Sequence, residues 1–300
     1  MAGSRKPRIW TGRDYNPSMK KLCVALACAG LAVAGRAQAG LAVPQSALQG
    51  DTVRVTMTEA AKPADIAAAT FEGKPVPVFS YQGDVTALVG IALNQKPGSY
   101  GFAYELSNGD MVGKLIRVQA RTRPQEALGV PEKLGGNTQQ AQTAVVNSLV
   151  AENAIISNLH SANQAFWSVL FRYPLRDASI TDPYGFERQT GQYVIAHKGT
   201  DFRAPVGTSV VAMNRGIVRL ARSFRIYGNT VIIDHGFGIM TLYMHLSKIN
   251  VNVGELVRQG QAIGLSGETG YAEGPHLHIS VHVGRISVDP IQFLSLFRTQ

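Results

Sequence analysis

The sequence predicts a mainly β protein in which two small β domains are joined by one helix. Short apolar runs separated by Gly, Pro and turn residues fill residues 40–121 and 174–300. Between them lies a stretch that repeats apolar residues at helical spacing. A chain of 300 residues with 45% hydrophobic content is long enough to bury about two cores.

Residues 1–39 are predicted to be a secretory signal peptide. The basic sequence at 19–21 precedes a short apolar run, and a small-residue cleavage sequence ends at Ala39. We expect cleavage after Ala39, with Met19 as the translation start and residues 1–18 outside the translated chain. The apolar run is too short for a comfortable membrane span. A different interpretation is a lipoprotein signal with Cys28 lipidated, although Ala25 stands where such signals usually carry Leu.

Removal of this segment changes two composition arguments. Residues 1–39 contain seven Lys or Arg and one Asp, so they carry +6 of the formal net charge of +9 and leave +3. A nucleic-acid-binding function therefore loses its main support. Cys23 and Cys28 also lie in the removed segment. We therefore expect a mature protein without disulfides, stabilised by core packing, to which a bound metal could add.

Residues 40–121 are predicted to form a small β-sandwich without catalytic chemistry. Val53, Val55 and Met57 alternate with polar residues, and residues 86–93 form an apolar run. The sequence Ser-Asn-Gly-Asp at 107–110 is a hairpin turn signal.

Residues 122–173 are predicted to be a linker with one long connecting helix. Between Thr138 and Val169 there is no Gly or Pro, and apolar residues recur at helical spacing. The pair Gly135-Gly136 just before this stretch is predicted to mark the boundary.

Residues 174–300 are predicted to form a second, antiparallel β domain, with one helix near residues 290–297. This part of the chain holds six of the seven histidines. Because side chains alternate along a strand, His276 and His278 face the same way, with their Cα atoms about 6.6 Å apart. One of them can bind a metal while the other stands beside it. His282 has the same parity but lies about 13 Å further along, so it is expected to line a groove or be structural.

A second group of polar residues surrounds Gly199. His197 and Asp201 are four residues apart, and Gly199 permits a bend that brings the imidazole and the carboxylate together. His245 adds another imidazole, at strand alternation with Tyr243. Two histidines and a carboxylate that leave one position for water are the ligand set of a catalytic zinc. Spacing alone leaves open which histidine of the 276/278 pair is the ligand.

These residues resemble the lysostaphin/LytM-type zinc endopeptidases, which cut peptidoglycan cross-bridges. The resemblance covers about residues 174–293 and rests on "HKGTDFRAPVGT", "GNTVIIDHG", "YMHLS", "VGELVRQGQAIG", "SGETG", "GPHLH" and "VDP" in family order. The preceding regions resemble the accessory region of Gram-negative members. The resemblance implies that His197, Asp201 and His278 bind one Zn²⁺ per chain. It implies that His245 and His276 are the catalytic histidines.

The resemblance also implies the reaction. A metal-activated water would hydrolyse peptide cross-links between peptidoglycan stem peptides, with His276 or His245 taking its proton and the other stabilising the oxyanion. We expect an exported, periplasmic enzyme with no nucleic-acid partner and no stable membrane span when mature. Arg188 is expected to contact a substrate carboxylate or to form a surface ion pair. Tyr243 is expected to line the groove, and His235 to be structural.

The main competing function is that of a catalytically inactive relative that binds and activates a cell-wall amidase. Such relatives typically lose metal ligands, whereas this chain keeps the full set. A peptidase that acts on proteins and a murein-binding module are two further candidate functions. A separate hypothesis, motivated by the long helix and its Gly-Gly boundary, is that the sandwich covers the groove until a protein partner moves it.

Overall fold

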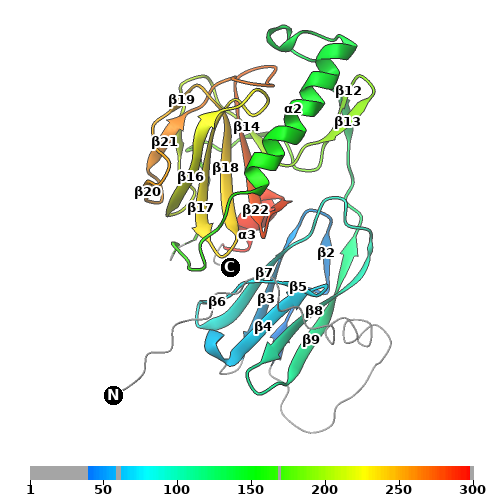
Figure 1. Ribbon diagram of the computed structural model, residues 1–300, viewed down its shortest axis with the longest axis vertical. Helices are drawn as coiled ribbons and strands as arrows, with labels where there is room; N and C mark the ends of the chain where they lie inside the picture. The colour runs from blue at the N-terminus through cyan, green and yellow to red at the C-terminus, as the bar shows by residue number, and fades with distance from the viewer. Residues whose placement is uncertain (1–39, 59–61, 168–169, 298–300) are drawn as a thin grey trace.

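The computed structural model describes residues 40–58, 62–167 and 170–297 (Figure 1). The predicted signal peptide, with Met19, Cys28 and the cleavage position at Ala39, lies outside the described residues. No helix within the described ranges has both the length and the apolar character that a membrane crossing requires.

The N-terminal part contains two β-sheets that pack face to face, at the lower end of the molecule in Figure 1. The four-stranded sheet has the order β1 (Gly40–Ala42), β3 (Thr52–Thr58), β7 (Asp84–Gly90) and β6 (Val78–Tyr81). The five-stranded sheet has the order β2 (Ser46–Leu48), β9 (Met111–Gln119), β8 (Gly98–Leu106), β4 (Ile66–Phe71) and β5 (Lys74–Pro75). A short 3₁₀ helix, Pro63–Asp65, precedes β4.

Both sheets contribute to one buried core, which confirms the predicted sandwich. Val53, Val55 and Met57 of β3 are buried in it, as their alternation predicts, together with Phe102 and Tyr104 of β8. The predicted turn at 107–110 joins β8 to β9, and Gly109 adopts a φ of 88° there.

The C-terminal part is built on an eight-stranded sheet whose strand pairs are all antiparallel, as predicted. Its order is β11 (Ile180–Asp182), β14 (Thr200–Arg203), β22 (His276–Val283), β18 (Ile239–Leu246), β17 (Asn229–Gly236), β16 (Gly216–Ser223) and β20 (Leu256–Val257), with β23 (Ile286–Val288) paired to β22. A three-stranded sheet lies beside it, in the order β15 (Ser209–Val211), β21 (Ala262–Leu265) and β19 (Lys248–Ile249). The predicted terminal helix is α3 (Pro290–Ser295).

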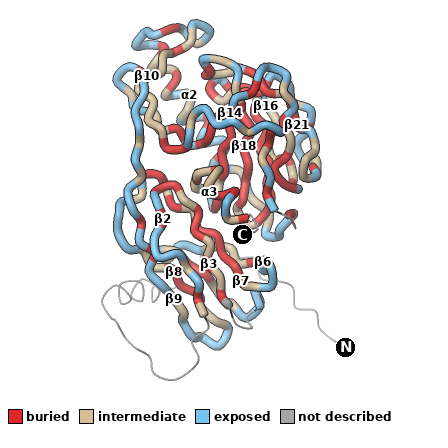
Figure 2. The backbone as a smooth tube through the Cα atoms, turned by 180° about the vertical axis from the view of Figure 1, so that it is seen from behind, coloured by how far each residue is buried: buried red, intermediate tan, exposed pale blue. Residues whose placement is uncertain are grey.

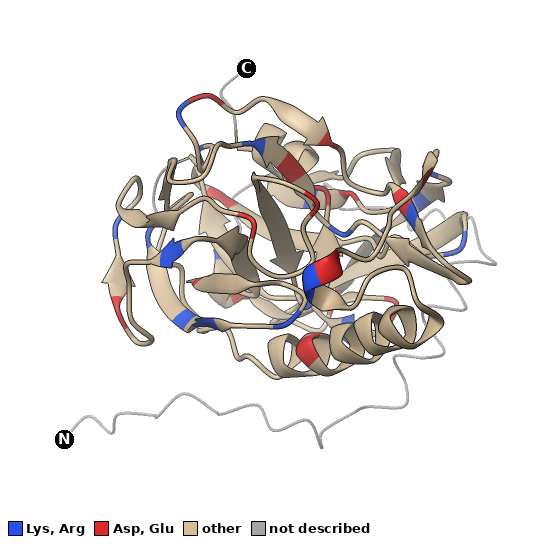
Figure 3. Ribbon diagram, turned by 90° about the horizontal axis from the view of Figure 1, so that it is seen from above, with Lys and Arg blue, Asp and Glu red and all other residues tan. Residues whose placement is uncertain are grey.

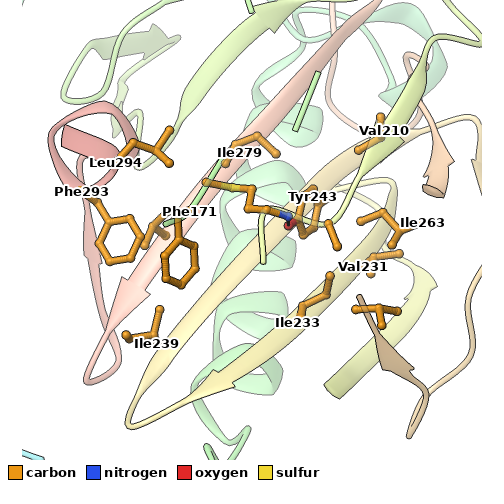
Figure 4. Packing of buried hydrophobic residues seen from close by; sticks show 14 of the residues in the cluster. Phe171, Val210, Val231, Ile233, Ile239, Tyr243, Ile263, Ile279, Phe293 and Leu294 are labelled. Atoms are coloured by element: carbon orange, nitrogen blue, oxygen red, sulfur yellow. Dashed lines mark hydrogen bonds between the residues drawn. The ribbon is translucent and has the colours of Figure 1, made fainter. Parts of the chain in front are cut away.

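One face of the large sheet is buried in the main core (Figure 4). Leu277 and Ile279 of β22 point into this core with Tyr243 of β18. Strand alternation therefore places His276 and His278 on the opposite face of β22.

The connecting segment crosses the face of the large sheet that carries His276 and His278. Strand β10 (Gln125–Ala127) pairs in parallel with β12 (Glu187–Thr190), which forms a hairpin with β13 (Tyr193–Ala196). A 3₁₀ helix (Glu132–Leu134) and helix α2 (Gln139–Ser157) follow β10. Among the residues of α2 only Glu152 is charged (Figure 3). The C-terminal end of α2 packs through Ile156 on apolar residues of β16, β17 and β18.

The prediction that this helix extends to Val169 was wrong. The helix ends at Ser157, although residues 158–169 contain no Gly or Pro. The Ser161 hydroxyl donates to Asp234 Oδ1 at 2.6 Å, and the Ala162 N–H donates to Asp234 Oδ2 at 2.9 Å. These hydrogen bonds to the buried carboxylate hold the chain beside the β17–β18 turn, and this tertiary interaction replaces the helical hydrogen bonds.

The sandwich packs against the end of the C-terminal domain that carries β23 and α3. The Phe79 ring stacks on Phe237, with centroids 5.3 Å apart. Arg121 forms ion pairs with Asp51 at 2.7 Å and with Asp289, the N-cap of α3, at 3.0 Å. Buried segments run through the strands of both parts, whereas exposed segments concentrate at turns (Figure 2). The two parts are thus joined by direct packing in addition to the linker.

Candidate metal centre and active site

Three side chains from adjacent segments converge on the face of the sheet opposite the main core. His197 follows β13, and Asp201 lies in β14. His278 lies in β22, where it pairs directly with Asp201 in the β14–β22 register. Antiparallel pairing therefore brings together two residues that are far apart in the sequence.

The three potential ligand atoms lie within hydrogen-bond distance of one another. His197 Nε2 is 3.1 Å from Asp201 Oδ1 and 3.0 Å from His278 Nδ1. His278 Nδ1 is 2.7 Å from the same Asp201 oxygen. Ligands at tetrahedral zinc lie about 3.3 Å apart, given bond lengths of 2.0–2.1 Å. The described residues thus include one buried His-His-Asp group whose size suits a metal ion. We call His197, Asp201 and His278 the metal group.

The outer hydrogen bonds fix which ring nitrogens carry protons. His197 Nδ1 lies 3.0 Å from the Pro183 carbonyl, which can only accept. The Ser280 hydroxyl donates to the Lys198 carbonyl at 2.9 Å, so it accepts from His278 Nε2 at 3.0 Å. His197 Nε2 and His278 Nδ1 are therefore unprotonated, and both lone pairs point at a carboxylate oxygen. Such an arrangement is repulsive unless a cation lies between the three atoms, so the group fits a metal ion.

Gly199 makes room for this arrangement. A Cβ atom at this position would lie 2.2 Å from His278 Nε2 and 2.5 Å from the Ile279 carbonyl oxygen. The bend predicted at Gly199 is present, but the steric requirement is the approach of the His278 ring.

Burial and neighbouring charges shift the pKa values of Asp201 and His278 in directions that suit metal binding. Burial alone would raise the pKa of Asp201, but His197 and His278, when protonated in the absence of a metal, hold it well below its usual range. Burial lowers the pKa of His278 to about 4, although Asp201 opposes this shift. The carboxylate and the neutral imidazole are the forms that bind metals.

His245 and His276 stand beside the metal group. Their ring centroids are 4.8 Å apart, and the centroid of His245 is 6.0 Å from that of His278. His245 Nδ1 donates to the Thr269 carbonyl at 2.8 Å, and His276 Nδ1 donates to the Gly274 carbonyl at 2.8 Å. Each ring thus keeps an unprotonated Nε2. His276 Nε2 is buried without a hydrogen-bond partner among the described residues, 3.9 Å from Asp201 Oδ1.

The backbone at His245 is unusual. It corrects the prediction that His245 alternates regularly with Tyr243 along the strand, and the prediction that Tyr243 lines the groove. His245 has a φ of 60°, next to an irregularity in the β17–β18 register. It therefore does not alternate regularly with Tyr243, and its ring reaches the side of the sheet that carries His278. Tyr243 points into the main core, where its hydroxyl accepts from the Met213 N–H at 2.8 Å. The prediction that Tyr243 lines the groove was wrong.

Arg188 contacts the metal group directly. Its guanidinium lies 2.5 Å from Asp201 Oδ2 and 3.8 Å from Asp182. Arg188 was expected either to contact a substrate carboxylate or to form a surface ion pair. The structure shows an ion pair, but its partner is the buried carboxylate of Asp201.

The remaining histidines of the domain lie outside the group. His235 is fully buried between the Arg215 carbonyl, at 2.9 Å, and the Thr241 hydroxyl, at 2.8 Å, as expected for a structural histidine. His282 is half-buried and pairs with Met240 and Ser287 across the sheet, away from the ligand atoms.

Two pockets meet at the metal group. The larger, which we call the main groove, has a volume of about 630 Å³ and includes His197, His245 and His278. The smaller, which we call the second pocket, has about 400 Å³ and includes Asp201 and His276. Arg188 lines both pockets.

Sequence reasoning missed several residues of this site. Ser280 fixes the His278 tautomer, and its position two residues after His278 on the same strand face was a usable signal. Helix α2 lines the main groove with Val146, Leu149 and Val150, although the sequence predicted only a connecting role for it. The helix lies over the face of the sheet that carries the histidines, and only the tertiary structure shows this.

Comparison with known proteins identifies the domain that carries this site. Residues 195–290 match the sequence profile of Peptidase family M23. The catalytic domain of lysostaphin from Staphylococcus simulans is 35% identical, with a TM-score of 0.37, over 39% of this chain and 92% of that domain. The chain belongs to peptidase family M23. The resemblance to lysostaphin-type peptidases is thereby confirmed.

Further M23 proteins match beyond the core motifs. A solved structure from Pseudomonas aeruginosa, described as an M23 peptidase, is 26% identical with a TM-score of 0.60, and the match covers 84% of this chain and 96% of that one. The shared fold thus extends beyond residues 195–290. Peptidoglycan DD-endopeptidase ShyA of Vibrio cholerae is 39% identical over 165 residues, which are 51% of this chain and 37% of ShyA. The chain therefore matches about a third of the length of this curated M23 relative.

Proposed function

We propose that the chain is a zinc-dependent endopeptidase that hydrolyses peptide cross-links of peptidoglycan. His197, Asp201 and His278 bind one zinc ion in this proposal. The observation that carries it is the convergence of two imidazole lone pairs and one carboxylate oxygen, 2.7–3.1 Å apart. A bound zinc ion would lower the pKa of a water to about 7 and polarise the scissile carbonyl.

His245 and His276 are the catalytic histidines in this proposal. Each has its Nδ1–H held by a backbone carbonyl, so each keeps an unprotonated Nε2 on a ring beside the metal group. One ring accepts the proton of the attacking water and passes it to the leaving amine. The other, when protonated, donates a hydrogen bond to the developing oxyanion. Burial, followed by the neighbouring His276 and His278, lowers the pKa of His245 well below its usual value, so His245 is neutral and suited to accept a proton.

The substrate and location are carried over from relatives. The name of ShyA specifies a peptidoglycan DD-endopeptidase, and we extend that specificity for D,D cross-links to this chain. The substrate lies outside the cytoplasm, so residues 1–39 would direct export to the periplasm. The domain arrangement that goes with this proposal is a sandwich at 40–121, a linker at 122–173 and the peptidase domain at 174–300.

Digestion of isolated sacculi by the zinc-loaded protein tests this function. We expect the wild type to release D,D-cleaved muropeptides, identified by chromatography and mass spectrometry. His245→Ala and His276→Ala should bind zinc but release at least ~100-fold less product. Loss of product with full zinc content would distinguish these two histidines from the zinc ligands, because replacing a ligand would also reduce the zinc content. No product from a wild-type protein with one zinc per chain would contradict the function.

A further inference from the structure

The main groove has an apolar wall that lies mostly outside residues 195–290, the part matched by the family profile. Val146, Leu149 and Val150 of α2 line the main groove together with Val194 and Ile195 of β13. Val150 is 65% exposed and Val194 is 54% exposed, which is high for valine side chains. The wall therefore offers small apolar surfaces to a molecule that enters the groove.

The groove is also positively charged. It is lined by Arg123, Arg188, Lys198 and Arg285, and its lining includes no Asp or Glu. Arg123 pairs with Glu187 at 3.4 Å, and Arg188 pairs with Asp201. The side chains of Lys198 and Arg285 have no hydrogen bond or ion pair within the part of the chain that the structure describes.

The second pocket has the opposite balance of charge. It includes the carboxylates of Glu126, Asp182 and Glu273 in addition to Asp201. A peptide that lies across the metal group would thus meet unpaired cations on one side and carboxylates on the other. An anionic group of the peptide is favoured in the main groove.

Lys198 and Arg285 line the end of the main groove at the β22–β23 turn. Lys198 follows His197, and its carbonyl accepts hydrogen bonds from Ser280 at 2.9 Å and Ser287 at 2.8 Å. These serines lie on β22 and β23, the two strands that the Arg285 turn joins. Both cations thus belong to one rigid corner of the groove.

The backbone at Arg285 is strained. Gly284 and Arg285 form the two-residue turn between β22 and β23, with φ values of 57° and 72°. A turn of this type favours Gly or Asn, and a long side chain at positive φ costs about 1 kcal/mol. This exposed arginine has no partner among the described residues, so its charge is available to a ligand.

We propose that Lys198 and Arg285 bind a free carboxylate of the substrate peptide, while Val146, Leu149 and Val150 contact its small apolar side chains. The two cations then determine specificity for stem peptides that carry free carboxylates, over the amidated forms. This inference rests on the proposed peptidoglycan endopeptidase function. It adds α2, outside the matched residues 195–290, to the substrate-binding surface.

Two synthetic peptide dimers with the same cross-link test this inference. One has free carboxylates along its stem peptides, and the other has carboxamides in the same positions. For the zinc-loaded full chain we expect kcat/KM to be about 10-fold higher for the free-acid dimer, because the amidated dimer loses a charge-assisted hydrogen bond. In the double variant Lys198→Gln/Arg285→Gln this ratio should fall to about 1. Lys248→Gln, an exposed cation outside the groove, should keep the wild-type ratio, as should the charge-conserving Lys198→Arg.

The ratio separates this inference from a general loss of activity. A double variant that loses activity equally on both dimers, or that keeps the wild-type ratio, would overturn the carboxylate site. If the wild type cleaves neither dimer, the endopeptidase function fails. The carboxylate site is then decided by the dissociation constants of the same two dimers, measured by calorimetry. A free-acid preference that disappears in the double variant supports the site, and equal affinities for the wild type refute it.

Discussion

Arg188 holds one oxygen of Asp201 while the second oxygen faces His197 and His278. The guanidinium lies 2.5 Å from Oδ2, and His197 Nε2 and His278 Nδ1 lie 3.1 and 2.7 Å from Oδ1. The ion pair thus orients the carboxylate so that a single oxygen is directed at the two imidazoles, where the proposed metal would bind. Carboxylate ligands are commonly fixed by outer hydrogen bonds of this kind.

Replacement of Arg188 should therefore weaken zinc binding. We expect Arg188→Ala to raise the zinc dissociation constant at least ~10-fold, because the buried carboxylate loses its orienting partner. Arg188→Lys should recover part of the affinity, since an ammonium keeps the charge but lacks the planar fork. Competition with a chelator measures both values.

A matched control is available at Arg219, which pairs with the buried Asp234 at 2.8 Å away from the metal group. Arg219→Lys should change thermal stability without changing zinc affinity. Equal effects of the two arginines on zinc affinity would contradict the orienting role of Arg188.

Ser280 should support zinc binding through the His278 tautomer. Ser280→Ala removes the acceptor of the Nε2–H, so Nδ1 is no longer fixed as the unprotonated nitrogen. We expect about 10-fold weaker zinc binding, measured by the same competition. Ser287→Ala is the matched control, because its hydroxyl also donates to the Lys198 carbonyl but is not hydrogen-bonded to His278. Wild-type zinc affinity in Ser280→Ala would rule out this role for the tautomer.

Gly199→Ala should disrupt the metal group sterically. The added Cβ would lie 2.2 Å from His278 Nε2, and a clash with a packed ring and backbone costs about 1–3 kcal/mol. We expect a lower melting temperature and less than one zinc per chain. Gly274→Ala is the control, since a Cβ there meets nothing within 4 Å and the carbonyl that accepts from His276 remains. Full zinc content in Gly199→Ala would be inconsistent with this packing.

His235 should make stability depend on pH. Burial lowers its pKa from 6.5 to about 4, so the unfolded chain binds a proton between these values while the folded chain does not. The free energy of unfolding should therefore fall as the pH falls from about 6.5 to about 4, by about 3 kcal/mol from this residue. Urea titrations across this range should give a shallower pH dependence for His235→Gln. The exposed His160→Gln should follow the wild type, and identical slopes for all three proteins would refute the assignment.

Local patterns in the sequence were sufficient for the elements and for much of the site. Alternation predicted the buried residues of β3 and the shared face of His276 and His278. The pairing of Asp201 with His278 follows from a strand register between distant segments, which no local pattern encodes. The left-handed backbone of His245 likewise depends on the irregular β17–β18 pairing, so strand alternation misplaced Tyr243.

The end of the connecting helix shows the same limit of local reasoning. Residues 158–169 lack Gly and Pro, and apolar periodicity continued into them. The helix nevertheless stops, because Ser161 and Ala162 bond to the carboxylate of Asp234, whose position depends on the folded sheet. Propensity is weak enough for such tertiary contacts to override it.

The most direct test of the proposed metal centre is anomalous diffraction at the zinc absorption edge from crystals of the protein. The proposed ligand set predicts one peak per chain, within bonding distance of His197 Nε2, Asp201 Oδ1 and His278 Nδ1. The absence of a peak there from crystals grown with zinc, or a peak held by different residues, would contradict it.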